Sequence, residues 1–245
     1  MSSLHDSFSS WFYMRRNQTP GAYWLPVALP GLRVAWFASL YDRGLVGSLP
    51  VGWGMTNAGA ATYAVATDWP GVLVPYVSGT YWTLPDSVIV SPTGDMTVGG
   101  WFWATTSGAK RGLINKWLTT GNKRAYTLYL DAADAVTFDT SGNGIAEKSV
   151  AGSAISTDQW TFVTGRIACG VSQDVCVNGV WTKNTTSVPA SVYGNVRSLY
   201  VGRWNESGAN YWDGYSAQWW LCGYYVPDSH IAWLFEEQAS YFGLT

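Results

Sequence analysis

The sequence is short of charge, histidine and cysteine. Only 12% of its 245 residues are charged and the net charge is −2, so no basic surface favours binding to nucleic acid or to an anionic membrane. No apolar run approaches the roughly 18 residues of a membrane-spanning helix. The two histidines, His5 and His230, are far apart, and the three cysteines lack metal-ligand spacing. No metal site is therefore expected.

An export signal is also missing from the start of the sequence. In residues 1–16, MSSLHDSFSSWFYMRR, the arginines follow the aromatic residues, and there is no apolar core of about 7–15 residues. A chain made in the cytoplasm keeps its thiols reduced, so Cys169, Cys176 and Cys222 are predicted to be free. The alternative is a Cys169–Cys176 disulfide, which requires the turn of a hairpin to fall at residues 172–173.

Carboxylates are too sparse for the hydrolytic chemistry that strands often support. None of the four glutamates has an acidic partner at an alternate strand position; they are Glu147, Glu206, Glu236 and Glu237. Retaining glycoside hydrolysis needs two carboxyls about 5–5.5 Å apart, and neither histidine is placed to activate a serine. We expect no catalytic residue and no enzyme activity.

Aromatic residues and glycine are abundant: the chain has 16 Trp, 15 Tyr and 27 Gly. Aromatic side chains favour strands, and glycine favours the turns between them. Short apolar runs separated by turn clusters such as 141-SGNG-144 predict an antiparallel sandwich or barrel. Asn178–Gly179 is a strong hairpin signal. The expected strands are residues 32–40, 72–77, 96–105, 112–118, 125–131, 135–140, 160–168, 174–181, 197–204 and 214–225.

One helix is predicted, in 227-PDSHIAWLFEEQ-238 near the C-terminus. Asp228 or Ser229 can cap its first N–H groups. Ile231, Leu234 and Phe235 fall on one face, which is expected to close the sandwich.

Residues 1–31 have no strand periodicity and contain three prolines, so we predict an extended N-terminal arm. A single domain, residues 32–245, follows it. The arm is too apolar to remain solvated and is expected to bury its aromatic residues against its own sandwich or a neighbouring subunit. The candidate interface residues are Trp11, Phe12, Tyr13, Arg15, Arg16, Tyr23, Trp24 and Leu25.

Four stretches, in this order, resemble the laminin-G-like, concanavalin A-like lectin/glucanase jelly roll. They are 94-GDMTVGGWFWAT-105; 112-GLINKW-117 with 126-YTLYLD-131; 158-DQWTFVTGRI-167 with 175-VCVNGVW-181; and 199-LYVGRW-204 with 213-DGYSAQWWLCGYYVPDSHIAWL-234. The resemblance covers roughly residues 32–240 and implies an all-β, antiparallel two-sheet jelly-roll sandwich. It also implies that the first stretch places a Trp on the inner face.

The sequence departs from this family at two places. Family members often carry acidic residues in the last strand, where this chain has Ala217, Gln218 and Trp219, and a glutamate near the start of the closing helix, where it has His230. The rim calcium ion of some relatives is therefore not supported. No cofactor is expected.

Aromatic and polar residues in the expected rim loops suggest a carbohydrate site. Aromatic faces pack against sugar rings, and Asn, Asp and Arg supply hydrogen bonds. The alternative is that these tryptophans belong to the core or to a subunit interface. The candidate binding residues are Trp117, Asn122, Arg124, Trp204, Asn205, Tyr211 and Trp212.

Fold alone does not decide function, and three hypotheses remain. The resemblance extends to sandwiches of phage virions, which need neither an export signal nor disulfides. The main hypothesis is a non-enzymatic capsid decoration or cement protein located in the virion, with the major capsid protein and itself, as a homotrimer, for partners. The alternatives are a tail or spike adhesin that binds host-surface carbohydrate, and a free carbohydrate-binding module.

Overall fold

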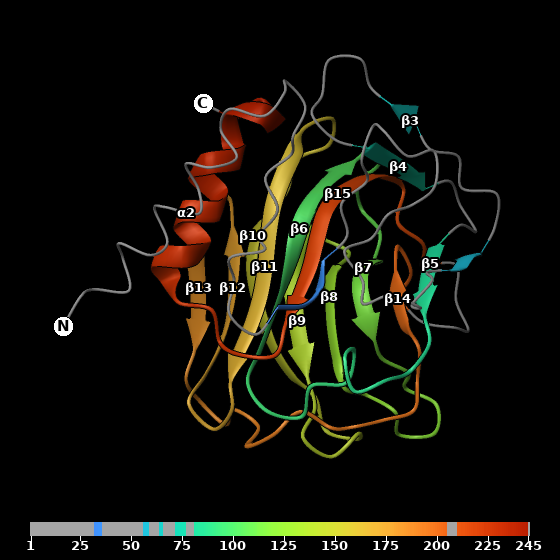
Figure 1. Cartoon of the computed structure of the whole chain (residues 1–245), viewed down its shortest axis with the longest axis vertical. Coiled ribbons are helices and arrows are strands. Elements are labelled where there is room, and N and C mark those ends of the chain that lie inside the picture. Colours follow the sequence, from blue (N-terminus) through green and yellow to red (C-terminus); the bar gives the residue numbers. More distant parts are fainter. Residues whose placement is uncertain are drawn as a thin grey trace.

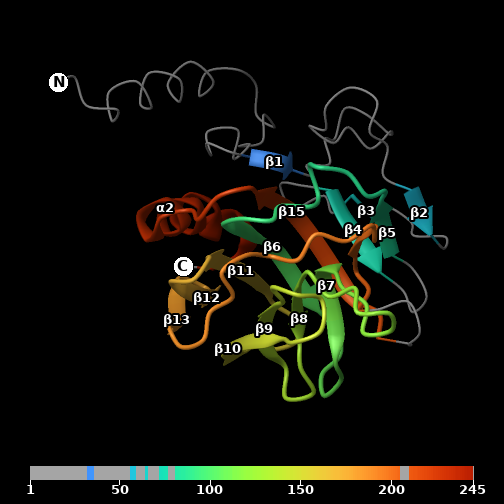
Figure 2. The same ribbon diagram turned by 90° about the horizontal axis from the view of Figure 1, so that it is seen from below.

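The part of the chain that the structure describes is an antiparallel β-sandwich with a helix packed on its outside (Figures 1 and 2). The computed structural model describes residues 32–35, 56–58, 64–65, 72–76, 81–204 and 210–244. The predicted arm, with its eight candidate interface residues, lies outside this part of the chain, as does Asn205. The predicted all-β, two-sheet jelly roll is confirmed.

Among the described residues, the strands form one eight-stranded and one seven-stranded sheet. In spatial order, the eight-stranded sheet contains β13 (Val180–Asn184), β12 (Ser172–Val177), β11 (Trp160–Ala168), β6 (Met96–Ala104), β15 (Gly214–Cys222), β4 (Val72–Tyr76) and β3 (Ala64–Val65), with β1 (Leu32–Ala35) also paired to β15. The seven-stranded sheet contains β10 (Lys148–Ala154), β9 (Ala135–Thr140), β8 (Tyr126–Leu130), β7 (Arg111–Lys116), β14 (Leu199–Val201), β5 (Tyr81–Leu84) and β2 (Thr56–Ala58).

The strands predicted from apolar alternation match the observed ones to within a few residues where the chain is described. The Asn178–Gly179 turn divides one expected strand into β12 and β13, and both residues have positive φ angles. Strands β2, β3, β5 and β10 were not predicted. The sequence of β10, KSVAGSA, is small and polar and alternates weakly. Strand β10 pairs with β9 from Lys148 to Ala151 and again at Ala154, so its partner rather than its composition makes it a strand.

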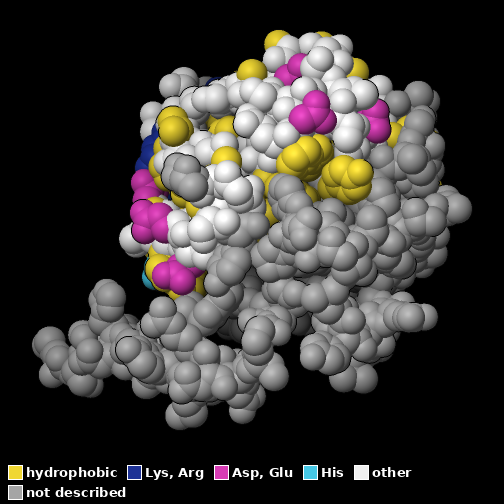
Figure 3. Space-filling model, turned by 90° about the horizontal axis from the view of Figure 1, so that it is seen from above, with side chains coloured by type: hydrophobic (Ala, Val, Ile, Leu, Met, Phe, Trp, Pro, Cys, Tyr) yellow, Lys and Arg dark blue, Asp and Glu magenta, His cyan; other side chains and the backbone are white. Residues whose placement is uncertain are grey.

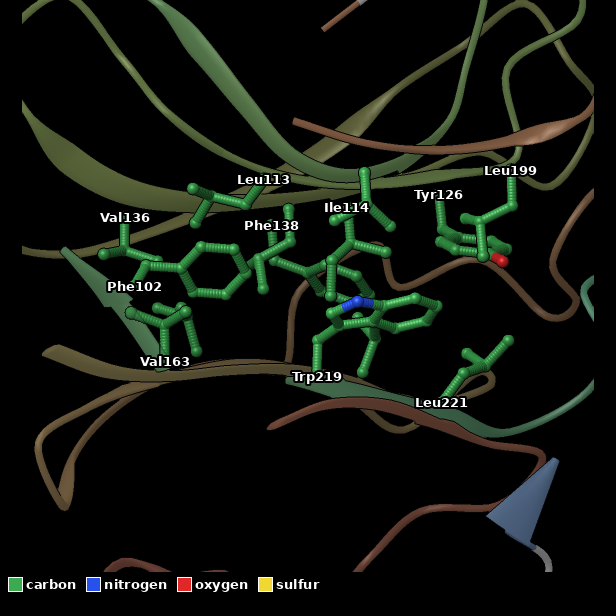
Figure 4. Close-up of a cluster of buried hydrophobic side chains, with 14 of the residues drawn as sticks. Phe102, Leu113, Ile114, Tyr126, Val136, Phe138, Val163, Leu199, Trp219 and Leu221 are labelled. Atoms are coloured by element: carbon green, nitrogen blue, oxygen red, sulfur yellow. The ribbon is translucent and has the colours of Figure 1, made fainter. Parts of the chain in front are cut away.

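The main core lies between the two sheets. Inward side chains of both sheets meet there, including Phe102, Val163 and Trp219 from one sheet and Ile114 and Phe138 from the other (Figure 4). All five are almost completely inaccessible to solvent. Burial of each such side chain stabilises the fold by roughly 1.5–3 kcal/mol.

A second core lies on the other face of the eight-stranded sheet, under helix α2 (Asp228–Ala239) and the short 3₁₀ helix η1 (Ser240–Phe242). Trp101 stacks on Phe242 with 4.1 Å between ring centroids, and its Nε1 donates to Gln238 Oε1 at 2.6 Å. The expectation that this strand places a Trp on the inner face is therefore wrong. Phe102 faces the inner core, and Trp101 faces the helix.

A β-bulge in β15 orients the neighbouring tryptophans. Between Ala217 and Trp220 the register with β6 shifts, and Gln218 has a φ of 46°. The bulge directs Trp219 to the inner core and Trp220 to the helix side. A Cβ on Gly100 would lie 2.8 Å from the Trp219 Cα, so the strand opposite the bulge requires a glycine there.

The helix starts differently from the prediction. Ile231 and Leu234 are buried, as expected, but Pro227 occupies the N-cap position and no side chain caps the first turn. Asp228 instead accepts hydrogen bonds from Arg166 and Lys183. No helix among the described residues has the length and apolar character required to cross a membrane.

All three cysteines are free, as predicted. The hairpin turn falls at residues 169–171, because Ala168 pairs with Ser172, and Cys176 lies opposite Thr164. The two thiols of the alternative disulfide are therefore not cross-strand neighbours.

We expect the folded protein to react slowly with thiol reagents and at Cys169 first. Burial raises the pKa of Cys169 to about 11 and the pKa values of Cys176 and Cys222 to about 12, and only Cys169 is partly exposed. Because the thiolate is the reactive form, denaturation without a reductant should release three rapidly reacting thiols. Titration of only one thiol would contradict this and indicate a disulfide.

Candidate functional site

Strands β8 and β9 present polar and aromatic side chains on the outer face of the seven-stranded sheet. Leu128 and Phe138 point into the core, so their neighbours Thr127, Tyr129 and Asp139 point outward, because strand side chains alternate between faces. Thr127 lies directly opposite Asp139 in the sheet register. These three side chains form the floor of the candidate site.

Three aromatic rings gather on this face. The Tyr129 and Trp204 ring centroids are 4.3 Å apart and the rings are inclined at 53°; the Trp117 ring is 6.4 Å from Trp204. Trp204 and Tyr129 keep 8% and 7% of their surface exposed, whereas Trp117 is fully covered. Trp204 therefore forms a wall beside Tyr129, supported from behind by Trp117.

The backbone of Arg203 and Trp204 crosses over β7 to place this wall. The side-chain amide of Asn115 donates to the carbonyl oxygens of both residues. A Cβ on Gly112 would lie 2.2–2.4 Å from Arg203 and Trp204 backbone atoms, so only glycine permits this approach. The position of Trp204 thus depends on two residues of β7.

Lys110 covers the rings. Its Nζ is 3.7 Å from the Trp204 ring centroid and 4.3 Å from that of Tyr129, which is cation–π geometry. Burial lowers the pKa of Lys110, although the carboxylates of Asp139 and Glu147 oppose this. Lys110 forms no salt bridge with any residue that the structure describes. Because its four-carbon chain is flexible, rotation of this side chain can expose the ring faces.

A buried ion pair fixes the loop that carries Lys110. Arg111 Nη2 lies 2.6 Å from Asp134 Oδ1, and the same carboxylate accepts the backbone N–H of Gly108 at 2.8 and 3.1 Å. Arg111 also donates to the carbonyl oxygen and the hydroxyl of Thr106. The loop is therefore held at both ends, which positions Lys110 over the site.

Asp139 is a buried carboxyl group with an unpartnered oxygen. Only 2% of the residue is exposed, and among the described residues neither its Oδ1 nor the Oγ1 of Thr127 has a hydrogen-bond partner. Burial raises the pKa of Asp139 to about 6, although the nearby hydroxyls of Ser149 and Tyr129 and the Lys110 ammonium oppose the increase. Burying a polar group without a partner costs about 1–3 kcal/mol.

Arg124 and Glu147 stand at the rim. Arg124 Nε is 4.0 Å from a Glu147 carboxylate oxygen, and its guanidinium carbon is 5.9 Å from the Trp117 ring centroid.

We use the name aromatic site for the residues of the floor, wall and cover: Lys110, Trp117, Thr127, Tyr129, Asp139 and Trp204. The site offers ring faces, a hydroxyl, an acceptor oxygen and a cation, which suit a ligand with both hydroxyls and apolar C–H faces.

The structure brings together only part of the residues predicted for carbohydrate binding. Trp117, Arg124 and Trp204 lie at the aromatic site. Tyr211 lies in a neighbouring aromatic cluster on the same side. Asn122 is exposed in the turn after β7, with a φ of 56°. Trp212 is completely buried between the sheets, edge-on to Phe102, so its role there is packing.

Lys110, Thr127, Tyr129 and Asp139 were not identified from the sequence. A signal for the last three exists, because 126-YTLYL-130 and 135-AVTFDT-140 alternate between core and outward positions. Outward positions of two consecutive strands share a face when the strands pair as a hairpin, as β8 and β9 do. Lys110 lies in a loop and carries no such signal.

The end of the sandwich toward which β6 runs has a different character. Acidic side chains stand there among hydrophobic and uncharged ones, with basic side chains at one margin of the visible described surface (Figure 3). Among the described residues, no group of three or more His, Cys, Asp or Glu side chains is placed to hold a metal ion. The aromatic site lies elsewhere, on the outer face of the seven-stranded sheet.

The family described as the concanavalin A-like lectin/glucanases superfamily matches residues 77–232, more than half of the chain. No curated protein matches the sequence. The binding domain of Paraclostridial Mosquitocidal Protein 1 has a similar fold, with a TM-score of 0.70 and 9% identity over 87% of this chain and 55% of that chain.

Two botulinum neurotoxin structures are similar as well. The serotype D ligand-binding domain, in complex with N-acetylneuraminic acid, gives a TM-score of 0.66 and 13% identity over 87% of this chain and 54% of that chain. The structure of the type C neurotoxin, whose cell entry depends on two ganglioside molecules, gives a TM-score of 0.62. Its identity is 10%, over 83% of this chain and 50% of that chain. The chain spans about half the length of these solved domains, and such low identities establish a shared fold alone.

Proposed function

The chain belongs to the concanavalin A-like lectin/glucanase superfamily, and from this premise we propose that it is a non-enzymatic glycan-binding module whose ligand occupies the aromatic site. The observation that carries the proposal is a pair of oxygens, one of Asp139 and one of Thr127, that lie beside two aromatic rings and have no hydrogen-bond partner among the described residues. Sugar hydroxyls can donate to these oxygens while the C–H face of the same sugar packs against a ring. A ligand of this kind offsets the unfavourable burial of both groups.

The preferred ligand in this proposal is an acidic glycan. Lys110 presents an ammonium group at the site without a described salt-bridge partner, and a sugar carboxylate can supply one. One structure of similar fold is a complex with N-acetylneuraminic acid, which makes sialylated sugars a reasonable first probe.

Glycan binding is better supported than the capsid decoration hypothesis. That hypothesis depends on the N-terminal arm as the surface that contacts the capsid and forms the homotrimer, and the arm lies outside the described residues. Two of the structures of similar fold named above are binding domains, one of Paraclostridial Mosquitocidal Protein 1 and one of a botulinum neurotoxin. An adhesin on a virion surface would use the aromatic site in the same way, and that location stays a prediction.

Lys110→Ala tests the proposal. We expect the variant to bind sialyllactose at least about tenfold more weakly than the unaltered protein, since a hydrogen bond between charged groups contributes about 1.5–3 kcal/mol. Binding of lactose should not weaken, because lactose has no carboxylate. Isothermal titration calorimetry at neutral pH measures both affinities.

Lys183→Ala is the matched control, because Lys183 is an exposed lysine of β13, in the other sheet. It should bind both sugars as the unaltered protein does. If the unaltered protein bound neither sialyllactose nor lactose nor other oligosaccharides, the proposed function would be wrong. If Lys110→Ala bound sialyllactose with undiminished affinity, the preference for acidic sugars would be wrong.

A further inference from the structure

A second aromatic cluster lies on the same outer face, beyond the wall formed by Trp204. The Tyr81 and Tyr211 rings stack with centroids 6.1 Å apart and an interplanar angle of 26°, and Tyr200 lies 5.6 Å from Tyr81. The Arg203 guanidinium is 4.7 Å from the Tyr81 ring centroid. Tyr81 and Tyr211 are partly exposed. This tyrosine cluster, made of Tyr81, Tyr200 and Tyr211, has no part in the site described above.

Sheet register connects the tyrosine cluster to the aromatic site. Paired residues form one continuous row across six strands: Ser149, Asp139, Thr127, Asn115, Tyr200 and Thr83. Each of these side chains carries a hydrogen-bonding group, and each lies on the outer face because its pairing partner does. Neighbouring strands are about 4.8 Å apart, so five intervals make the row about 24 Å long. One monosaccharide cannot occupy a row of this length.

The backbone of Arg203 and Trp204 crosses the row and covers Asn115, which has no exposed surface, so a ligand that reaches both clusters must pass over this segment. Trp204 turns its ring toward Tyr129 on β8, and Arg203 extends toward Tyr81 on β5 and forms an isolated bridge with Tyr211. One short segment therefore builds both clusters. The result is two aromatic clusters, one on each side of the Arg203–Trp204 segment, aligned across the strands.

We propose that the ligand is an extended oligosaccharide that lies across the strands, with one part at the aromatic site and a more distant sugar on the tyrosine cluster. The proposal rests on the proposed glycan-binding function and deepens it. The aromatic site takes the acidic sugar through Lys110 and Asp139, and the Tyr81 and Tyr211 rings take a sugar several units along the chain. Affinity then depends on the length of the oligosaccharide as well as on its terminal group.

A length series of N-acetylneuraminic acid oligomers, from the monomer to the pentamer, tests the proposal by calorimetry. We expect affinity to rise about tenfold or more between the dimer and the pentamer, because a second aromatic contact is gained. Tyr211→Ala should abolish this increase and leave the affinity for the dimer unchanged. Tyr81→Ala should act in the same way, so the test does not depend on one variant.

Tyr224→Ala is the matched control, because Tyr224 is a partly exposed tyrosine that packs against the core under helix α2. It should retain the full dependence on length. Equal affinity at every length, or an equal loss for dimer and pentamer in Tyr211→Ala, would overturn the extended ligand and leave the aromatic site intact. Failure of every oligomer and of sialyllactose to bind would overturn the preference for acidic sugars and this inference with it. Failure of lactose and other neutral oligosaccharides as well would overturn the proposed function itself.

Discussion

Replacing Arg166 by alanine is expected to lower the free energy of unfolding by about 3–5 kcal/mol, because the change leaves a buried carboxylate without its charge partner. Neither Arg166 nor Asp174 has any exposed side-chain surface, and Arg166 Nε lies 3.1 Å from Asp174 Oδ2. The guanidinium also donates to the Val226 carbonyl at 2.6 Å and lies between the rings of Trp181 and Tyr225, at 3.6 and 4.1 Å.

This side chain also holds the start of helix α2. Its Nη2 donates to Asp228, the first residue of the helix, and Tyr225 donates to the same Asp174 oxygen at 2.5 Å. The loss should therefore appear as early exchange of the amide hydrogens in α2, in addition to a lower urea midpoint.

A double variant separates the lost charge partner from lost packing. Arg166→Met combined with Asp174→Leu removes both charges and keeps most of the volume, and such replacements of buried ion pairs are often neutral or stabilising. It should recover most of the stability that Arg166→Ala loses. Arg166→Lys should recover little, because an ammonium cannot supply the planar stacking and the forked donors of a guanidinium. A loss below about 1 kcal/mol in Arg166→Ala, as expected for an exposed pair, would contradict this account.

Asp139→Asn is expected to have the opposite effect and raise the free energy of unfolding at pH 7. The pKa of Asp139 in the folded protein is about 6, against an ordinary value of 3.8, and burial is the main cause. Between these two pH values the folded protein holds a proton that the unfolded chain has released, so stability falls as pH rises from about 4 to about 6. The folded and unfolded pKa values of Asp139 differ by about two units, and each pKa unit corresponds to about 1.4 kcal/mol. The free energy of unfolding at pH 7 is therefore lower by about 3 kcal/mol than it is at low pH.

An asparagine carries no charge and should remove this pH-dependent loss. Urea unfolding of both proteins at pH 4 and pH 7 should give a difference in stability that appears only at the higher pH. Asp158→Asn, at an exposed position with a positive φ, is the control and should show no such difference. If Asp139→Asn were less stable than the unaltered protein at pH 7, the carboxylate would have a stabilising partner and the aromatic site would lose its main support.

Asp139→Asn should weaken ligand binding although it raises stability. In Asp139→Asn the new side-chain amide retains one acceptor oxygen but not the charge, and hydrogen bonds to charged groups are about twice as strong as neutral ones. We therefore expect the more stable variant to bind sialyllactose more weakly. A gain in stability with a loss of binding is common where a site carries a polar group that the fold alone does not need.

The sequence by itself determined the class of fold. Alternation in stretches such as 135-AVTFDT-140, the Asn178–Gly179 turn and the apolar face of 227-PDSHIAWLFEEQ-238 are local patterns, and local backbone preferences settle them. The absence of paired carboxylates and of metal-ligand spacing is equally visible in the sequence. Where local preference is weak, as in β10, the prediction failed, because pairing with β9 supplied what the residues did not.

Alternation indicates which residues of β8 and β9 face outward, but only the tertiary structure decided which of them come together in the site. Asp139, Thr127, Asn115 and Tyr200 share one row because of the register between strands that are distant in sequence, and a shift by one residue would turn each of them to the other face. The bulge in β15 likewise decided which tryptophan faces the inner core, and Trp204 reaches Tyr129 because Gly112 lets its backbone cross β7. Register, bulges and close backbone approaches depend on contacts between distant segments, and no local pattern in the chain encodes them.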